Sequence, residues 1–274
     1  MNAADLLNEH VGVLKSRMGT FYPGSHVVYR GQNLHEDLKD MDWLALYLFG
    51  ITGRRFDQSQ LRLLSAIWSY TSYPDVRLWN NRVAALAGST RSTGTLGMAA
   101  ALAVSEASIY GGPPMLRAVE FFTRCRRQLE QGASLDACIR EELAKNRNIG
   151  GYGRPLVNSD ERILPLLELA AELGLDNGPY LKLALEVEDK LLHGRWRMKM
   201  NYAALVAALG SDLGLDEREL YLFVFPVFLA GMPPGYIEAG SRPEGTLYPM
   251  PCDYILYDGP SRRTWPDSQA DHRL

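Results

Sequence analysis

The chain has 274 residues, a length that corresponds to about two domains of ordinary size. Hydrophobic residues make up 46% of it and charged residues 22%, which is typical of a soluble globular protein and excludes disordered and fibrous classes. The net charge of −3 provides no overall basic field for a polyanion, so we expect no nucleic-acid partner.

The three cysteines, Cys125, Cys138 and Cys252, are scattered and lack CxxC spacing. This pattern argues against a disulfide framework and a cysteine-built zinc site, and we expect no metal centre. The first ten residues lack the charged and apolar regions of a signal peptide. No stretch reaches the ~18 uncharged apolar residues of a membrane span, so we expect a cytoplasmic protein without a membrane partner.

Between Asp40 and Gly231 apolar residues recur every three or four positions, which predicts an almost entirely helical protein. The first predicted helix has its apolar face between positions 38 and 48 and ends at Gly50 or Gly53. The next has its face between positions 61 and 68 and ends before Pro74. Further helices are predicted over 76–87 and over the alanine-rich segment 95–109, which stops at the Gly-Gly-Pro-Pro sequence 111–114.

The composition changes after this stop. Two helices rich in arginine and glutamate are predicted next, followed by amphipathic helices over 160–173, with Ser159 as the N-cap, and over 179–192. The alanine-rich character returns at Met200, with predicted core helices over 203–209 and 220–230. The sequence therefore predicts a smaller helical domain inserted into a larger one, followed by an irregular tail with a short hairpin at 253–257.

Two glycine-containing segments carry residues suited to chemistry. At 110–112 (YGG), paired glycines let the backbone approach a ligand, or simply end the helix. The loop 148–155 (NIGGYGRP) presents backbone N–H groups beside Arg154 and Arg162, a combination suited to an anion, although a plain interdomain loop fits equally well. It is neither a Walker motif nor a Rossmann fingerprint.

Two further segments are basic. Residues 195–201 (RWRMKMN) place three cations around Trp196, an arrangement suited either to a phosphate or adenine, or to a solvated face with Trp196 beneath arginine stems. In the tail, 241–243 (SRP) and 257–263 (YDGPSRR) contain further arginines. Arg242 is a candidate ligand for a carboxylate only if the fold brings it to a cleft.

Taken in order, these segments resemble the citrate synthase family over most of the chain. The family pattern runs His-Gly-Gly/Ala, Gly-x-Gly-His with a later Asp-Pro-Arg, Pro-Asn-Val-Asp, Arg-Pro and Tyr-x-Gly-Pro. The sequences here are IYGG at 109–112, GYGR at 151–154 with DER at 160–162, MNYA at 200–203, SRP at 241–243 and YDGP at 257–260. In addition, VYRG at 28–31 resembles an early turn of the family.

The resemblance implies an all-α, citrate synthase-like fold and a homodimer. It implies a large helical domain of residues 1–111 plus 204–274 and a small helical domain of residues 112–203. In the family the two domains close over a cleft that holds an acyl-CoA and an oxoacid. A coenzyme A thioester is thus implied as a substrate, and no other cofactor is indicated.

The resemblance also shows that the catalytic residues of the family are replaced. In the family a histidine and an aspartate enolise the acyl-CoA and a second histidine protonates the oxoacid; these positions hold Tyr110, Ala203 and Arg154 here. Alanine cannot accept a proton, and loss of a general base costs about 10²–10⁴ in rate. Arginine, with a pKa above ~12, is a poor proton donor but a strong binder of carboxylates and phosphates. None of the five histidines lies in a motif: His10, His26, His35, His193 and His272.

The expected site follows from these matches. Tyr110 and Arg154 are the expected catalytic residues, since a guanidinium beside Tyr110 would lower the pKa of its phenol. A family histidine falls near Ser72 or Tyr73, and one family arginine is replaced near Phe228. The expected substrate-binding residues are Ser72, Arg82, Arg162, Asn201 and Arg242, and the expected cofactor-binding residues are Gly151 and Gly153.

Two functions remain open from the sequence. One is a divergent citrate synthase-like lyase or transferase that acts on an anionic carboxylate or acyl substrate with non-standard catalytic residues. The alternative is a catalytically inactive citrate synthase paralogue that binds a ligand or acts as a scaffold. The retained glycine-rich loop, arginines and Asn201 favour the enzyme.

Overall fold

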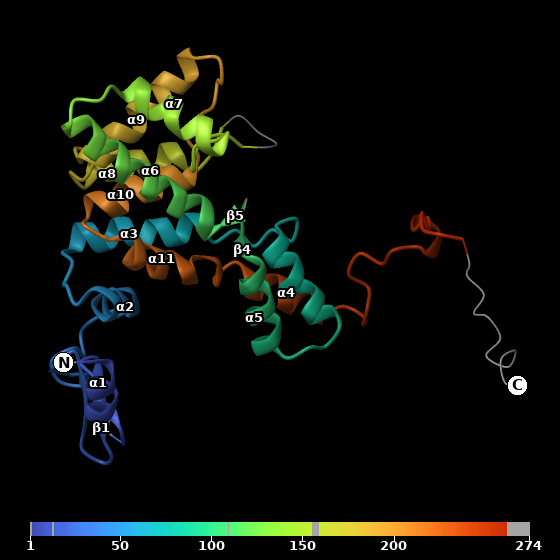
Figure 1. Ribbon diagram of the computed structural model, residues 1–274. Coiled ribbons are helices and arrows are strands. Elements are labelled where there is room, and N and C mark those ends of the chain that lie inside the picture. The colour runs from blue at the N-terminus through green and yellow to red at the C-terminus, as the bar shows by residue number, and fades with distance from the viewer. Residues whose placement is uncertain (1, 13, 109, 155–158, 262–274) are drawn as a thin grey trace, which may run out of the picture.

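The computed structural model describes residues 2–12, 14–108, 110–154 and 159–261. It is mainly α-helical, with a three-stranded antiparallel sheet near the N-terminus and a second, two-stranded sheet, in agreement with the predicted all-α class. Figure 1 shows α6 to α10 as a bundle above α3 and α11, with the N-terminal sheet extending below α2. Helices α4 and α5 stand to one side, and the C-terminal segment leads away from them.

The helices vary from 8 to 19 residues in length. They are α1 (Ala3–His10), α2 (Trp43–Thr52), α3 (Gln58–Thr71), α4 (Trp79–Ser89), α5 (Gly94–Val104), α6 (Gly112–Glu130), α7 (Leu135–Asn146), α8 (Ile163–Glu172), α9 (Pro179–His193), α10 (Tyr202–Asp212), α11 (Glu217–Val224) and α12 (Met232–Gly240). The strands are β1 (Gly19–Tyr22), β2 (His26–Tyr29) and β3 (Gln32–Asn33) in one sheet and β4 (Glu106–Ala107) and β5 (Tyr110–Gly111) in the other. Two 3₁₀ helices are η1 (Phe225–Phe228) and η2 (Cys252–Tyr254).

Local sequence signals set the ends of α2 and α3. Asp42 caps α2 by accepting the N–H of Ala45, so the helix begins after position 38, where the predicted apolar face starts. Gly53, one of the two predicted ends, ends the helix in the left-handed conformation. Asp57 and Gln60 form a reciprocal capping box at the start of α3. These caps satisfy backbone donors that the first turn of each helix leaves without intrahelical partners.

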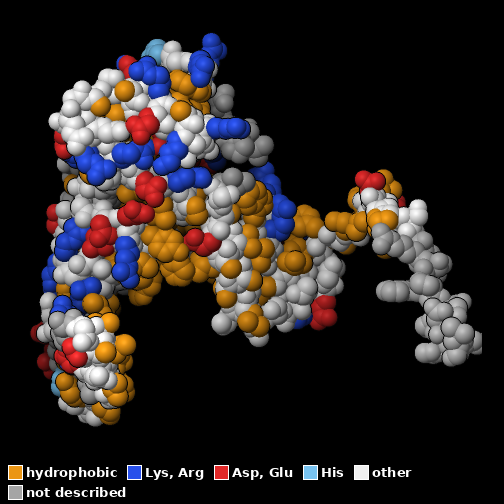
Figure 2. Space-filling model, viewed as in Figure 1, with side chains coloured by type: hydrophobic (Ala, Val, Ile, Leu, Met, Phe, Trp, Pro, Cys, Tyr) orange, Lys and Arg blue, Asp and Glu red, His pale blue; other side chains and the backbone are white. Residues whose placement is uncertain are grey.

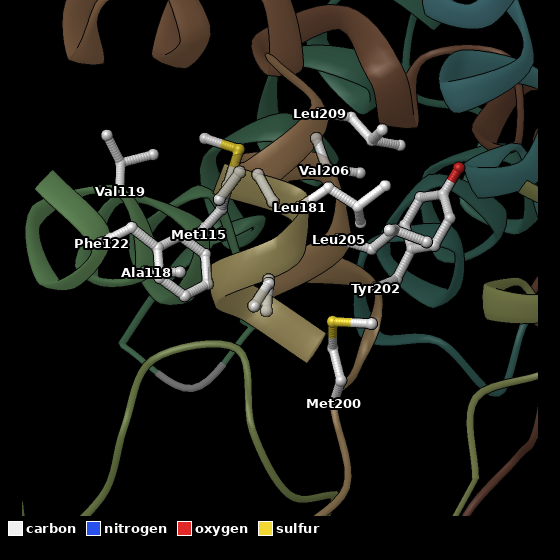
Figure 3. Packing of buried hydrophobic residues seen from close by; sticks show 14 of the residues in the cluster. Met115, Ala118, Val119, Phe122, Leu181, Met200, Tyr202, Leu205, Val206 and Leu209 are labelled. Atoms are coloured by element: carbon white, nitrogen blue, oxygen red, sulfur yellow. The ribbon is translucent and has the colours of Figure 1, made fainter. Parts of the chain in front are cut away.

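The main core forms where α6, α9 and α10 meet. Nearly all of α10 is buried, and its small residues allow close approach of the neighbouring helices. Figure 3 shows side chains of α6, including Met115 and Phe122, in the same cluster as Leu181 of α9 and Leu205 and Val206 of α10. Burying each large apolar side chain stabilises the fold by roughly 1.5–3 kcal/mol, so packing at this junction holds α10 firmly in place.

A second, smaller cluster joins α4, α5 and α12 through Ala84, Ala101 and Met232. By contrast, buried residues of α6 to α9 share one continuous cluster with α3, α10 and α11. The predicted boundary between residues 112–203 and the rest of the chain is therefore not marked by a gap in the core. That two-domain division stays a prediction.

Several predicted elements were wrong at their ends. The alanine-rich helix stops at Val104 rather than at position 109, because residues 106–107 pair with 110–111 as strands. Helix α4 begins at Trp79, three residues after the predicted start at position 76. The helix predicted over 220–230 becomes α11 and η1, since Pro226 has no N–H for the α-helical ladder. The tail has a 3₁₀ turn at Cys252–Tyr254 in place of the predicted hairpin.

Helix α8 also differs from the prediction. It begins at Ile163 without a side-chain cap, so Ser159 is not its N-cap. The reason is that Asp160 and Arg162 are engaged with each other outside the helix, and Asp160 accepts a backbone N–H from a different helix.

Among the described residues, the stretch Glu217–Gly240 has the length and composition of a membrane span, with a mean hydropathy of 1.6. This segment is not one regular helix, because η1 and residues 229–231 separate α11 from α12. Leu220, Phe223 and Met232 are fully buried inside the protein. The expectation that no stretch has the length and composition of a membrane span is thus corrected for Glu217–Gly240, of which 44% is buried inside the protein.

Candidate functional site

A group of charged and phenolic side chains lies where four separate segments meet at the start of α10. We call it the arginine cluster; its members are Tyr73, Arg154, Asp160, Glu161, Arg162 and Tyr202. Tyr73 follows α3, Arg154 ends the glycine-rich loop, and residues 160–162 precede α8. The fold thus brings together Arg154 and Arg162, two of the residues expected from the sequence.

Asp160 and Arg162 form a buried, two-pronged ion pair. Nε and Nη2 of Arg162 each donate to a different oxygen of Asp160, both at 2.8 Å. Oδ2 of Asp160 also accepts the N–H of Tyr202 at 3.0 Å, at the positive end of α10. Burial alone would raise the pKa of Asp160, but its bonds to Arg162 and Tyr202 outweigh burial and lower the pKa. Asp160 therefore stays ionised at neutral pH.

The guanidinium of Arg162 is also covered by aromatic rings. It lies 4.3 Å from the ring centre of Tyr202 and 5.5 Å from that of Tyr73. Burial would lower the pKa of Arg162, but the carboxylate of Asp160 raises it above its usual value. Arg162 is thus a permanently charged group held in a fixed orientation.

Arg154 is the more accessible arginine, with 30% of its side chain exposed. Its Nη1 donates to the carbonyl of Ser159 at 2.8 Å and to Oε2 of Glu161 at 3.1 Å. The same nitrogen lies 4.0 Å from Oδ2 of Asp160. Two of its partners lie on the surface-exposed side of the cluster, so Arg154 can exchange a protein acceptor for a ligand oxygen at small cost.

Tyr73 completes the exposed side of the cluster. Its hydroxyl donates to Oε1 of Glu161 at 2.8 Å. Burial and this hydrogen bond raise the pKa of Tyr73 to about 12, whereas the pKa of Glu161 is lowered by its own backbone N–H, by Tyr73 and by Arg154. At neutral pH Tyr73 is therefore a protonated donor and Glu161 a charged acceptor.

Asn201 ties the glycine-rich loop to α10. Its side chain caps the helix by accepting the N–H of Ala203 at 3.0 Å and donates to the carbonyl of Gly153 at 2.9 Å. Its backbone N–H donates to the carbonyl of Gly151 at 2.8 Å. Asn201 thereby fixes the position of Arg154, which follows Gly153 directly.

The two expected cofactor-binding glycines have positive φ values, 81° for Gly151 and 84° for Gly153. A Cβ on Gly151 would lie 2.6 Å from the backbone N of Ala204, so only glycine allows this approach to α10. The N–H of Gly153 donates to the carbonyl of Lys199 at 2.7 Å. Both glycines have a structural reason to be present, and a role in cofactor binding stays a prediction.

The other expected residues have these places. The hydroxyl of Ser72 donates to the carbonyl of Trp68 at 2.8 Å, next to Tyr73 in the chain. Arg82 donates to the carbonyls of Val76 and Arg77 at 3.3 and 3.0 Å, and so holds the turn before α4.

Arg242 lies at the far end of α12 from the arginine cluster. Gly231, just before α12, packs against the backbone of Ser72 and Tyr73, whereas Arg242 follows the helix and pairs with Glu238. The nine residues of α12 rise by about 14 Å between these ends. The described chain therefore does not bring Arg242 to the cluster.

Some expected residues fall at or beyond the limits of the description. The backbone of Tyr110 pairs with Ala107 in the second sheet, while its side chain lies outside what the structure describes. Arg262 and Arg263 of the tail motif also lie outside the described residues. In the described part of the chain no group of three or more His, Cys, Asp or Glu side chains is arranged for a metal ion.

Sequence reasoning missed Tyr202 and the role of Asp160. Both were visible only as parts of the motif segments, because an Asp-x-Arg spacing does not reveal burial. The same spacing occurs at Asp75 and Arg77, where the pair is exposed.

Comparisons with known proteins identify the fold. No protein-family model matches the sequence, and no curated protein matches it. Among solved structures, citryl-CoA lyase from Hydrogenobacter thermophilus is similar over 93% of this chain and 98% of its own, with a TM-score of 0.80 and 18% identity.

Two larger proteins are also similar. ATP citrate lyase from Methanothrix soehngenii, solved in complex with citrate and coenzyme A, is matched over 95% of this chain and 45% of its own, with a TM-score of 0.71 and 18% identity. Citrate synthase from Thermotoga maritima is matched over 83% of this chain and 60% of its own, with a TM-score of 0.62 and 18% identity. The chain therefore has the citrate synthase-like fold that its motifs predicted.

Proposed function

We propose that this protein, on its citrate synthase-like fold, is a lyase or transferase that acts on an anionic carboxylate or a coenzyme A thioester. The observation that carries the proposal is the convergence of Arg154, Arg162 and Tyr73 at the start of α10. It is supported by the likeness to a citryl-CoA lyase over almost the full length of both chains.

The arrangement favours binding of a carboxylate. Arg154 offers a partly exposed guanidinium, whose planar fork matches the geometry of a carboxylate. Tyr73 adds a neutral O–H donor beside it, since its raised pKa keeps it protonated. Arg162, which is more buried than Arg154, contributes a second positive charge, and its ion pair with Asp160 fixes the orientation of its guanidinium. A substrate carboxylate would replace Glu161 as the partner of Arg154.

The chemical step differs from that of the citrate synthase family in this proposal. Ala203 stands in the first turn of α10 and has no group that accepts a proton. Asp160 is buried and fully engaged, so it serves to position Arg162 rather than to act as a base. Tyr110 remains our proposed proton donor or acceptor, and Arg154 our proposed stabiliser of negative charge.

The test is product analysis with matched variants. We expect purified protein, incubated with citryl-CoA or with acyl-CoA and oxoacid pairs, to give a product detectable by mass spectrometry. Arg154→Gln should weaken substrate binding about tenfold or more, as expected for a charged hydrogen bond. Arg62→Gln, which changes an exposed arginine of α3, is the matched control and should leave turnover unchanged.

Two results would contradict this proposal. If Tyr110→Phe gives the same product at the same rate, Tyr110 is not part of the mechanism. If Arg154→Gln and Arg62→Gln have equal effects on KM, the arginine cluster is not the substrate site.

One observation favours the second candidate function, a non-catalytic ligand-binding or scaffold protein. Each charged side chain of the arginine cluster already has a protein partner of opposite charge. Calorimetry with coenzyme A esters and di- or tricarboxylates separates the two functions. Binding without turnover supports the non-catalytic function. A thermal-shift measurement detects such binding as well, because a ligand at 100 times its Kd stabilises the folded protein by about 2.7 kcal/mol.

We further propose that the protein is a homodimer. Figure 2 shows apolar side chains gathered on the hollowed face between the N-terminal part and α5. Trp43, Phe225 and Leu96 are large apolar residues exposed by 61%, 42% and 65%. Light scattering after size exclusion should give the mass of a dimer for the natural protein and a smaller mass for Phe225→Asp. A monomer at micromolar concentration would contradict this proposal.

A further inference from the structure

Two buried cysteines meet at the contact between α6 and α7. Cys125 lies in α6 and is fully buried, and Cys138 lies in the first turn of α7 with 3% of its surface exposed. The thiol of Cys125 is hydrogen-bonded to the thiol of Cys138. We call these two residues the thiol pair. The cysteines are scattered in the sequence, so it is the packing of the two helices that brings this pair together.

Polar side chains near the thiol pair also join α6 to α7. Arg124, the residue before Cys125, forms an ion pair with Glu142 of α7, and only 4% of the Glu142 side chain is exposed. Nε2 of Gln128 donates to Oε2 of Glu141 at 2.8 Å. Each of these contacts involves residues within about one helical turn of a cysteine. The two helices are therefore held against each other where the thiols meet.

The connection between the two helices is short and well ordered. Helix α6 ends at Glu130 and α7 begins at Leu135. Ser134 caps α7 by accepting the N–H of Ala137 at 3.2 Å, and its carbonyl accepts the N–H of Cys138, also at 3.2 Å. A disulfide at the thiol pair would close a small ring around this connection. Such a ring forms without moving any distant segment of the chain.

Cys252 offers an internal comparison. It is exposed, and it lies in η2 within the C-terminal segment that leads away from the helices in Figure 1. An exposed thiol meets oxidants of every size as well as the thiols of other molecules, so its oxidation depends on what is dissolved around it. Each member of the thiol pair, by contrast, has its reaction partner beside it in the fold.

Burial decides which oxidant reaches the thiol pair and how fast it reacts. A small, uncharged peroxide enters through brief local openings of the helices, whereas burial excludes a large disulfide such as oxidised glutathione. Burial and the hydrogen bond with Cys138 raise the pKa of Cys125 to about 12. The thiolate is the form that attacks an oxidant, so the reaction is slow at neutral pH. The pair therefore responds to sustained rather than brief oxidation.

We propose that the thiol pair is a covalent modification site, where a peroxide joins Cys125 and Cys138 as a disulfide. One sulfur, as thiolate, attacks an oxygen of hydrogen peroxide; the O–O bond breaks, a sulfenic acid forms, and the leaving hydroxide takes up the thiol proton as water. The second thiolate attacks the sulfenic sulfur, the S–O bond breaks, and a second water leaves. Two thiols are thus oxidised by two electrons while one peroxide is reduced to two waters. The inference does not rest on the proposed reaction, since neither cysteine belongs to the arginine cluster.

The disulfide would fix the first turn of α7 to α6. Helix α7 is attached to the rest of the protein along one face, where Cys138, Ile139 and Glu142 are buried. A cross-link at Cys138 restricts the unfolded chain and opposes local opening of α7. Oxidation should therefore stabilise this helix more than helices of the main core such as α10, which no part of the ring contains.

The test uses the full chain with Cys252→Ser, because an exposed thiol would otherwise join two molecules. The folded protein is treated with hydrogen peroxide at mildly alkaline pH, remaining thiols are alkylated in urea, and tryptic peptides are analysed by mass spectrometry without reductant. Trypsin cleaves after Arg126 and Arg127, between the cysteines, so the disulfide appears as two linked peptides. We expect this linked pair to be the main oxidation product and dithiothreitol to separate it.

The same samples report the structural effect. Oxidation should raise the Tm by about 5 °C and slow hydrogen exchange of α7 about tenfold, with α10 unchanged. Cys125→Ala in the same background is the control and should show neither effect; peptide mapping needs no substitution in the core, so it stands even if this variant is unstable. The proposal is overturned if peroxide leaves both thiols free, if it converts either to sulfinic acid without a disulfide, or if oxidised glutathione modifies the pair as fast as peroxide. The presence or absence of lyase or transferase activity alters none of these measurements.

Discussion

Arg162 donates hydrogen bonds to Asp160 from two nitrogens, each 2.8 Å from a different carboxylate oxygen, and only 1% of the Asp160 side chain is exposed. The chain contains the same Asp-x-Arg spacing at Asp75 and Arg77, where Nε donates to Oδ1 at 3.1 Å and to Oδ2 at 2.9 Å, and Nη2 donates to Oδ2 at 2.6 Å. There the aspartate side chain is 35% exposed and the arginine 86%. The protein thus contains a buried and an exposed version of one local interaction.

Removing the charge of Asp160 should destabilise the protein strongly. Asp160→Asn leaves the guanidinium of Arg162 buried without a counter-charge, which typically costs about 3–5 kcal/mol. Urea unfolding monitored by circular dichroism measures this loss. Asp75→Asn is the matched control and should change stability little, because water solvates both partners. Equal losses for the two variants would show that burial does not control the strength of the pair.

The lowered pKa values of Asp160 and Glu161 predict a loss of stability in acid. Unfolded aspartate and glutamate titrate near about 3.9 and 4.3. Below these values the unfolded chain binds more protons than the folded one, so the free energy of unfolding falls as pH falls through the lowered pKa values. The contribution is fully present above about pH 5. Urea unfolding between pH 3 and 7 should show a weaker pH dependence for Asp160→Asn than for the natural protein.

Gly151→Ala should be far more damaging than an alanine at another glycine of positive φ. A Cβ at position 151 would contact the backbone N of Ala204 at 2.6 Å, whereas a Cβ at Gly132 would meet no atom within 4 Å. Gly132→Ala should cost only the strain of the left-handed conformation, about 1 kcal/mol. We expect a loss of at least about 3 kcal/mol for Gly151→Ala by chemical denaturation. Similar midpoints for both variants would contradict the close approach of the loop to α10.

Tyr73→Phe should shift the titration of Glu161. The variant removes the O–H that Tyr73 donates to Glu161, so the pKa of Glu161 should rise toward its usual value. Carbon-13 NMR of the glutamate carboxyl groups measures this change. Tyr221→Phe, whose hydroxyl lies 3.3 Å from Glu106, is the matched control and should leave Glu161 unchanged. An unaltered Glu161 in Tyr73→Phe would mean that this hydrogen bond is absent in solution.

Ala203→Asp should add the base that the proposed site lacks. An aspartate in the first turn of α10 is favoured by the helix dipole, so little stability should be lost. If a coenzyme A thioester binds nearby, deuterium exchange at its α-carbon should increase by about 10²-fold. Mass spectrometry of acetyl-CoA incubated in heavy water measures this, with Ala203→Asn as the control of similar size. Equal exchange in the two variants would place the thioester elsewhere.

The sequence was sufficient to predict the helical class and most of the helices. Gly53, one of the two glycines predicted to end the first helix, does end α2, whereas the predicted apolar face began at position 38 and the helix begins only at Trp43. The resemblance in the motif order also predicted the fold, because motif order reflects the whole topology rather than one segment. Helix ends depend on residues that are close in the sequence, and the fold class is indicated by the order of the motifs along the chain.

Other features depend on contacts between distant segments. Asp160 accepts the N–H of Tyr202, 42 positions away, and this contact keeps residues 160–162 outside α8. The placement of Arg242 at the other end of α12 follows from how that helix packs on α4, which no motif encodes. Periodicity cannot reveal such contacts because it describes one element at a time.

Helices α4, α5 and α12, which share the small cluster, should unfold locally more readily than the rest of the protein. The three buried residues of this cluster bury far less apolar surface than the main core, so the amides of these helices should exchange with solvent deuterium through openings that leave α6 and α10 closed. Asn81 of α4 donates to the carbonyl of Tyr73 and thereby connects this unit to the arginine cluster. Each opening would break the hydrogen bond from Asn81 to Tyr73, while the ion pair of Arg162 with Asp160 stays closed.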